Sequence, residues 1–360
     1  MYFKSIELNN FRNYTDLKLE FDPKLNLIIG DNAQGKTNLL ESLFIMGLGK
    51  SFKTNNDKEM IMFRQKEGRA SCVVADEDGE ETGIDISYTK DGKIIKVDGV
   101  KLARNIDLLE NVYVVVFSPE DLRIVKDGPE HRRRFLDREL CQIKPVYYSD
   151  LGNYKKVLRQ RNALLREMPS DKRLLEVYDE TLSDYGFRVV EERKKFIERL
   201  KVICRNIHSS ISNGKEELEI SYETHTTSKA YFREMLSLNL KEDIIRGYTS
   251  FGPHKDFLGI KINGLDTRIY GSQGQQRTAS LSMKLAEIEL IKQETGHNAV
   301  LLLDDVFSEL DSDRQKYLIE TMKDVQVFVT ATGMDEEIIK LLPKGNVYIV
   351  DKGKVNLYNR

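Results

Sequence analysis

The chain has 360 residues and a formal net charge of −2, with 40% hydrophobic and 32% charged residues, which is typical of a globular protein of two or three domains with a charge-rich surface. Its longest apolar runs are far too short to cross a bilayer and no signal-peptide pattern follows Met1, so we expect no membrane partner. The three widely spaced cysteines provide neither a disulfide framework nor a metal-binding knuckle, which favours a reducing cytoplasm.

The first motif follows three short strands, at residues 2–9, 17–21 and 25–29, which are predicted to form a small sheet. The third strand is apolar and runs into GDNAQGKT, a match to the phosphate loop GxxxxGK(S/T), and a helix is predicted over 37–48. Backbone N–H groups of such a loop bind phosphate oxygens. We therefore predict an ATP and Mg²⁺ site in which the lysine neutralises phosphate charge and the threonine hydroxyl is a Mg²⁺ ligand. The loop residues are Gly30, Asp31, Asn32, Ala33, Gln34, Gly35, Lys36 and Thr37.

The middle of the chain changes from strands to helices. Residues 69–98 alternate as antiparallel strands do, with Asp91-Gly92 as a hairpin turn. Over 129–212 turn residues are few and charge is dense. Apolar residues recur there at three- and four-residue steps, as one buried helix face requires, at Leu174, Val177, Tyr178, Leu182, Tyr185, Val189 and Phe196. This pattern predicts a helical insertion.

Strand and helix signals alternate again after about Leu218, which predicts a parallel central sheet. A hairpin is predicted around 256–262 with Asn263-Gly264 as its turn. The elements expected after it are helices at 275–295, 312–323 and 335–341, strands at 299–304 and 326–330, and a closing hairpin of 346–350 and 354–358.

The second motif, VLLLDD at 300–305, is a buried strand with two carboxylates at its C-terminal end, where ligands of α/β sheets bind. We expect Asp304 to hold Mg²⁺ through water and Asp305 to orient or deprotonate the attacking water. The alternative is a core strand that happens to end at two acids, which the phosphate loop in the same chain disfavours.

The third motif is SQGQQ at 272–276, and Ser272 follows Thr37 by 235 residues. Ser272 and Gln275 fit a capping box, in which each side chain bonds the other residue's backbone N–H at a helix start. A capped helix start also presents N–H groups and a hydroxyl to an anion. The motif is therefore open to two interpretations, a helix cap and a phosphate-binding turn.

Taken in order, GDNAQGKT, SQGQQ, VLLLDD and SELD at 308–311 resemble the heads of ABC-type ATPases of the SMC class. The chain is also similar along nearly its whole length to the RecF family, the bacterial recombination mediators of the gap-repair pathway. That resemblance rests on NFRNY at 10–14, SFK at 51–53, FSPEDL at 117–122, RRRFLD at 132–137 and GPH at 252–254.

The resemblance implies an α/β fold, in which an ATPase head with a mixed central sheet and an antiparallel subdomain carries an inserted helical arm. The expected parts are the N-terminal part of the head at 1–120, the arm at 121–215, and the C-terminal part of the head at 216–360. In such heads ATP is bound by the phosphate loop of one subunit and capped by the signature motif of another, so ATP binding produces a homodimer.

The resemblance also implies roles for individual residues. The signature motif, which acts on the partner's ATP, comprises Ser272, Gln273, Gly274 and Gln275. Ser272 and Gly274 are expected to touch the γ-phosphate, and Asp311 is expected at the dimer interface. Arg12 is expected near the nucleotide, with a solvated turn arginine as the alternative. Lys36 and Asp305 are the expected catalytic residues.

The chain departs from the family pattern in three places. Asp305 stands where most heads carry glutamate, and its shorter side chain predicts slow hydrolysis. The apolar strand at 112–117 is followed by Ser-Pro-Glu with no glutamine loop, which leaves Ser118 or Glu120 as substitutes. No switch histidine follows the strand at 326–330, where Thr330 or Thr332 can donate a hydrogen bond but no proton.

Double-stranded or gapped DNA is a partner that the resemblance implies, together with RecR and, indirectly, RecO and RecA. Residues 144–166 contain six basic side chains and one acid, and such a helix face contacts phosphates without reading bases. The alternative is a solvated charged helix. Arg132 to Arg134 could equally pair with acids nearby in the sequence, namely Asp127, Glu130 and Asp137. The DNA candidates are Lys144, Lys155, Lys156, Arg159 and Arg161.

These features together predict a slow, DNA-stimulated ATPase of recombinational DNA repair and replication restart. Its ATP-bound homodimer is expected to clamp duplex DNA at gaps and help a partner to load recombinase. A generic ABC-type ATPase subunit, transporter-like or SMC-like, is the alternative. A transporter subunit should carry the glutamine loop and switch histidine, and a metabolic phosphate-loop kinase needs no signature motif.

Overall fold

The computed structural model describes residues 1–167, 172–333 and 342–358. The chain divides into two compact units, one of Met1–Leu122 with Lys284–Arg360 and the other of Arg123–Met283. Residues 216–283, assigned from the sequence to the C-terminal part of the head, share the second unit with the helical segment. The helix predicted at 335–341 lies outside the described residues.

An antiparallel sheet in the first unit has the strand order β2-β1-β4-β5-β6-β7. Burial alternates along its strands because one face packs on the core while the other is exposed. Thr89 pairs with Gly92, so the predicted hairpin is confirmed. Its two-residue turn is Lys90-Asp91, one position before the predicted Asp91-Gly92, because Gly92 already pairs in the strand. The strands are β1 Tyr2–Phe11, β2 Tyr14–Glu20, β4 Gly68–Ala75, β5 Glu81–Thr89, β6 Gly92–Val97 and β7 Val100–Lys101.

The second sheet of this unit is the predicted central sheet, in the order β15-β14-β3-β13-β12-β8. Five adjacent strands, β14, β3, β13, β12 and β8, are parallel to one another. Strand β15 pairs antiparallel to β14 at the edge of the sheet. Strand β3 belongs here, not to the small N-terminal sheet in which the sequence had placed it. The strands are β3 Leu25–Ile29, β8 Val114–Phe117, β12 Val300–Asp304, β13 Val327–Ala331, β14 Asn346–Asp351 and β15 Lys354–Tyr358.

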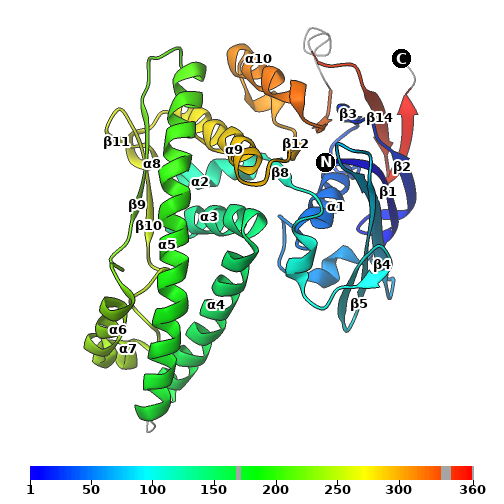
Figure 1. Cartoon of the computed structure of the whole chain (residues 1–360). Coiled ribbons are helices and arrows are strands. Elements are labelled where there is room, and N and C mark those ends of the chain that lie inside the picture. Colours follow the sequence, from blue (N-terminus) through cyan, green and yellow to red (C-terminus); the bar gives the residue numbers. More distant parts are fainter. Residues whose placement is uncertain (168–171, 334–341, 359–360) are drawn as a thin grey trace. The chain divides into compact units, whose positions relative to one another are not determined.

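Helix α1 (Lys36–Leu48) follows the phosphate loop and contacts strands of both sheets (Figure 1). Because it is covered on several sides, ten of its residues are buried and it lacks a polar face. The C-terminal part of α9 (Gln273–Thr295) also belongs to this unit. The unit's other helical segments are η1 Asp57–Met60, η2 Asn105–Leu108, η3 Pro119–Leu122, η4 Phe307–Glu309, α10 Ser312–Thr321 and η5 Met322–Asp324.

The second unit contains the helical insertion predicted over 129–212. Helices α4 and α5 run side by side (Figure 1). Leu182, Val189 and Phe196 are buried along α5 as predicted, but Leu174 and Val177 are exposed because the buried face begins at Leu175. The helices are α2 Arg123–Lys126, α3 Pro129–Ile143, α4 Pro145–Arg166, α5 Lys172–Ile211, α6 Lys229–Leu238, α7 Leu240–Arg246 and α8 Thr267–Tyr270.

A small antiparallel sheet completes this unit, in the order β11-β10-β9. Its strands are β9 Leu218–Glu223, β10 Phe257–Ile262 and β11 Leu265–Asp266. The predicted Asn263-Gly264 turn joins β10 to β11, with φ of 50° and 78° at the two residues. Two consecutive positive φ angles define the tight hairpin turn that favours this dipeptide, so the predicted hairpin is confirmed.

Candidate nucleotide-binding site

The phosphate loop joins the end of β3 to the start of α1. Gly35 has φ of +122°, and a Cβ at this position would lie 2.5 Å from Asn13 Nδ2, so the loop requires glycine here. Tyr14 donates its hydroxyl to Gly35 O at 2.9 Å, and Asn13 Nδ2 donates to Gln34 O at 2.9 Å. The β1–β2 turn therefore holds the loop's last residues in place.

The turn between β14 and β15 holds the same loop from the other end of the chain. Lys352 N donates to Gln34 Oε1 at 2.6 Å, and Gly353 N donates to Gln34 O at 3.1 Å. Nothing local in the sequence signals this contact, because 318 positions separate Gln34 from Lys352. The contact leaves the loop fixed by two separate turns, which favours a rigid anion-binding shape.

Lys36 is almost fully buried at the first position of α1. Its ammonium donates to the carbonyl oxygens of Gly30 and Asp31, at 2.6 and 2.9 Å. Both acceptors belong to the loop itself, so the lysine places a positive charge inside the loop. A lysine ammonium inside the loop is where the predicted neutralisation of phosphate charge needs it to be.

Three side chains and one backbone N–H group meet where α1 begins and β12 ends. Thr37 Oγ1 donates to Asp304 Oδ1 at 2.9 Å, and Thr330 Oγ1 donates to the same oxygen at 2.8 Å. The Thr330 oxygen also accepts from Asp305 N at 3.0 Å. The structure thus brings together both predicted Mg²⁺ ligands and shows that Thr330, at the end of the neighbouring strand, links them to Asp305.

Asp305 adopts a left-handed backbone conformation, with φ of +56°. Such a conformation is uncommon outside glycine and asparagine, and strained backbone of this kind clusters at functional sites. Burial raises the pKa of the Asp305 carboxyl, the positive charge of Lys36 opposes that rise, and Asp304 and Glu309 add to it. A carboxylate with a raised pKa accepts a proton more readily than an ordinary aspartate does.

Arg12 lies in a buried ion pair with a residue of α1. Its guanidinium donates two hydrogen bonds to the carboxylate of Glu41, at 2.9 and 2.7 Å, and Glu41 is fully buried. Ser51 also donates to Glu41, and Lys53 Nζ is 4.0 Å from it. The solvated-turn alternative for Arg12 is therefore wrong. Its proximity to nucleotide stays a prediction.

The SQGQQ motif forms the reciprocal capping box expected of it, within the second unit. Ser272 N donates to Gln275 Oε1 at 2.9 Å, and Gln275 N donates to Ser272 Oγ at 3.2 Å. Ser272 and Gln273 are exposed. The cap interpretation is confirmed. It leaves the anion interpretation open, because the Ser272 hydroxyl only accepts in this arrangement and its own hydrogen is free to be donated.

Two other motif residues, Asp311 and Ser118, make local hydrogen bonds. Asp311 caps α10 by accepting from Arg314 N at 3.1 Å, and the two side chains also form an ion pair. Ser118 is buried, and its hydroxyl donates to Asp121 at 3.2 Å. Glu120 is exposed after the strand that lacks a glutamine loop.

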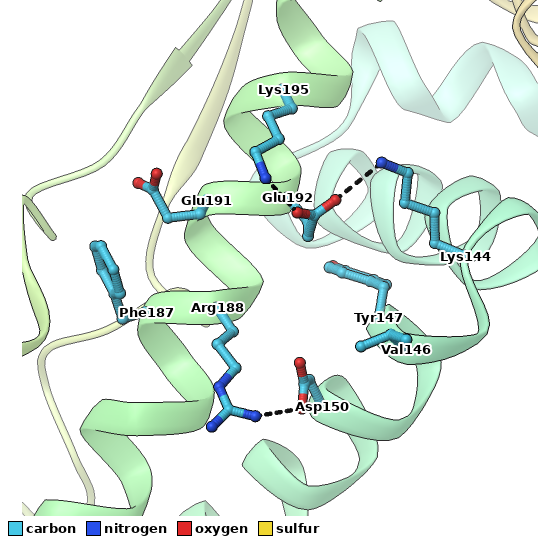
Figure 2. Close-up of a pocket in the computed structure, with 9 residues that line it drawn as sticks. All are labelled: Lys144, Val146, Tyr147, Asp150, Phe187, Arg188, Glu191, Glu192 and Lys195. Atoms are coloured by element: carbon cyan, nitrogen blue, oxygen red, sulfur yellow. Dashed lines mark hydrogen bonds and ion pairs between the residues drawn. The ribbon is translucent and has the colours of Figure 1, made fainter. Parts of the chain in front are cut away.

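The predicted DNA candidates divide into paired and exposed side chains. Lys144 lines a pocket of about 390 Å³ with residues of α4 and α5 (Figure 2). Its ammonium lies 3.0 Å from Glu192, which Lys195 also contacts at 2.7 Å, and Arg188 lies 3.6 Å from Asp150 in the same pocket. Because positive and negative groups alternate there, the pocket is poorly suited to a polyanion.

Arg161 is fully buried, so it cannot contact DNA, and this candidate is wrong. Its guanidinium lies 2.6 Å from Asp179 and 2.8 Å from Asp243. Arg161 lies two positions from Arg159 and therefore faces the opposite, packed side of α4. Lys155 pairs with Asp137 at 3.0 Å. Lys156 and Arg159 are exposed, as are Gly152, Ala163 and Arg166 on the same helix face.

Residues of the RRRFLD and GPH motifs make hydrogen bonds and ion pairs within the second unit. Arg132 is buried and donates to three backbone carbonyls, so it pairs with none of the acids suggested for it. Arg134 pairs with Glu130 at 2.6 Å, as suggested. His254 Nδ1 lies 2.5 Å from the hydroxyl of Tyr154.

The described residues contain no group of three or more histidine, cysteine or acidic side chains that could hold a metal ion. The pair formed by Thr37 and Asp304 nevertheless fits Mg²⁺, because this ion prefers oxygen ligands and is commonly held by one or two protein side chains together with substrate phosphates and water. None of the helices in the described part of the chain is long and apolar enough to cross a membrane.

The fold and the site define a phosphate-loop ATPase head of the SMC class. Residues 2–344 match the model of the RecF/RecN/SMC N-terminal domain. DNA replication and repair protein RecF of Clostridium botulinum strain ATCC 19397 is 45% identical, with 99% of each chain covered, and that of Clostridium novyi strain NT is 45% identical, with 99% of this chain and 100% of the relative covered. The chain belongs to the RecF family.

Solved structures agree with this assignment. A structure of the recombination mediator protein RecF-ATP in the RecFOR pathway superposes with a TM-score of 0.92 at 38% identity, covering 99% of this chain and 98% of that one. An Smc head domain from Pyrococcus furiosus superposes with a TM-score of 0.57 at 16% identity, covering 99% of this chain and 96% of that one. The second likeness shows the shared fold alone.

Proposed function

We propose that this chain binds ATP with Mg²⁺ at the phosphate loop and hydrolyses it slowly. The contact between Thr37 and Asp304 carries this proposal, because it joins the loop to the acidic end of β12. Similar chains are described in complex with ATP. Thr37 and Asp304 would hold the Mg²⁺ ion, which neutralises charge on the phosphates when bound.

The protein groups at this site have separable tasks. Lys36 and the backbone N–H groups of the loop bind the phosphates. Asp305 orients the attacking water and accepts its proton, a role that its raised pKa favours. The carboxylate of aspartate extends less far than that of glutamate, which supports slow hydrolysis. Thr330 takes the place of a switch histidine and donates a hydrogen bond to Asp304.

The ATP site is completed by a second copy of the chain. Ser272 and Gln273 are exposed at the start of α9, where a helix N-terminus attracts anions. We assign Ser272, Gly274 and Asp311 to the interface, with Ser272 on the partner's γ-phosphate. ADP lacks that phosphate, so only ATP should stabilise the homodimer.

The dimer acts on DNA in recombinational repair, as the name of the relatives suggests. Segment 151–166 of α4 has no acidic residue, and its exposed face carries Lys156, Arg159 and Arg166 together with the small residues Gly152 and Ala163. Phosphates can approach such a face closely. The three-part organisation, with an arm at 121–215, is part of this proposal.

The preferred substrate is duplex DNA at gaps. RecR is the direct partner we propose, with RecO and RecA acting through it, since the solved relatives belong to the RecFOR pathway. A generic SMC-like clamp without the gap-repair role is the second candidate. Hydrolysis measured without DNA, with duplex and with gapped duplex tests the proposal. Stimulation by both DNAs supports it, and no stimulation by either contradicts it.

A further inference from the structure

The signature turn is held by a carboxylate outside the motif. Gln275 Nε2 donates to Glu216 Oε1 at 3.0 Å, while Gln275 Oε1 accepts from Ser272 N at 2.9 Å. Glu216 lies in the segment between the end of α5 and the start of β9. Both the oxygen and the nitrogen of the Gln275 side-chain amide, which caps the start of α9, are therefore hydrogen-bonded.

The second oxygen of Glu216 faces the last turn of the long helix α5. Glu216 Oε2 lies 3.2 Å from Nε2 of His208, and His208 is fully buried. The other ring nitrogen of His208 lies 3.2 Å from Ser282 Oγ on α9. One carboxylate thus joins the end of α5 to the start of α9, and all four residues belong to the same compact unit.

The chemistry of these groups fixes the orientation of the Gln275 side-chain amide. An ionised carboxylate only accepts hydrogen bonds, so the NH₂ end of the Gln275 amide must face Glu216. The carbonyl end then necessarily faces Ser272 N. If the amide were reversed, its NH₂ group would oppose the Ser272 N–H, and two donors would face each other. The carboxylate therefore selects the capped form of the turn.

We propose that Glu216 is the positioning residue of the signature motif and connects it to α5. In the selected form the Ser272 hydroxyl accepts from Gln275 N, and its own hydrogen is free to be donated to an anion. Removal of the carboxylate lets the amide rotate and weakens that orientation. Because His208 lies in the last turn of α5, a displacement of α5 against α9 changes the same contact.

This inference rests on the proposed ATP-dependent homodimer. The test compares ATP-dependent dimerisation of the full chain with Glu216→Ala, Glu216→Gln, Gln275→Ala and the double variant Glu216→Ala/Gln275→Ala. Glu219→Ala is the matched control, since Glu219 is an exposed acid on β9 opposite Lys261. Thermal unfolding of each variant, and nucleotide binding to the monomer, show whether the fold and the phosphate loop are intact.

Glu216→Ala should weaken the dimer about tenfold or more, since a hydrogen bond to a charged group is lost, while nucleotide binding to the monomer is unchanged. Glu216→Gln, which keeps one carbonyl acceptor, should retain part of the affinity. The double variant should be no weaker than Gln275→Ala alone, because Glu216 acts through that amide.

The inference alone is overturned by a normal dimer from Glu216→Ala, or by effects of Glu216→Ala and Gln275→Ala that add in full. A Glu219→Ala variant as weak as Glu216→Ala overturns it as well, because the effect is then general to this surface. If the unmodified chain forms no dimer with ATP, the proposed function fails and the inference fails with it.

Discussion

Thr37 Oγ1 lies 2.9 Å from Asp304 Oδ1, although 267 positions separate the two residues in the chain. The same carboxylate oxygen accepts from Thr330 at 2.8 Å, so two hydroxyls from different elements fix its orientation. This convergence joins the phosphate loop, the acidic strand end and the neighbouring strand into one site. It also identifies Thr330 as a residue whose hydroxyl can be tested directly.

Thr330→Val should lower the turnover of ATP at least tenfold with little change in nucleotide affinity. The substitution keeps the side chain's shape but leaves Asp305 N without its acceptor and Asp304 with one donor fewer. Thr330→Ser should restore most of the turnover because it keeps the hydroxyl. Equal rates for the valine and serine variants would show that the hydroxyl has no part in catalysis.

Asp305→Asn should bind ATP and dimerise but release DNA slowly, because the amide cannot accept a proton from water. In the unmodified chain the rate should fall as the pH is lowered through the pKa of Asp305, since the base is then protonated. That pKa is raised by burial, so the loss begins at a higher pH than for an ordinary aspartate. An unmodified chain whose rate shows no acid limb would contradict this role.

Arg12→Ala should destabilise the first unit by about 3 kcal/mol, because the buried carboxylate of Glu41 loses two charged hydrogen bonds and keeps only the more distant Lys53 as a cation. Lys18→Ala removes an exposed pair with Glu7 and should have a much smaller effect on stability. Chemical unfolding of both variants measures the difference. Similar losses in the two would mean that the Arg12 pair is no stronger than a surface contact.

Mutations can distinguish the exposed cations of α4 from a cation that already pairs with an acid. Replacing Lys156, Arg159 and Arg166 together by alanine should weaken duplex binding and reduce the salt slope by about 3, with no change in sequence preference. Lys144→Ala is the control, because Lys144 already pairs with Glu192. Fluorescence anisotropy at several salt concentrations gives both values. An unaltered slope in the triple variant would place the DNA elsewhere.

Much of the site could be predicted because its signals are local. The phosphate loop, the capping box of Ser272 and Gln275, and the hairpin turn at Asn263-Gly264 each occupy a few consecutive residues whose chemistry dictates their conformation. The central sheet followed from continuous apolar runs such as that of β12. These features depend on backbone and side-chain geometry within one turn or one strand.

Other features depend on contacts between distant parts of the chain and had no local signal. Three contacts are of this kind: the hydrogen bond from Lys352 N to Gln34, the ion pair of Arg12 with Glu41, and the hydrogen bond from Gln275 to Glu216. The prediction that Arg161 contacts DNA failed because a basic run on a helix does not show by itself which cations face inward. A buried arginine with two acidic partners and an exposed arginine give the run the same composition.

In the proposed function, ATP joins two copies of this chain through the signature turn. Light scattering on a sizing column, with ATP, ADP or no nucleotide, should show a dimer with ATP only. Ser272→Arg should remain a monomer that still binds ATP. Ser228→Arg, which removes the cap of α6 in the same unit, should dimerise normally. A Ser272→Arg variant that dimerises with ATP as the unmodified chain does would contradict the claim.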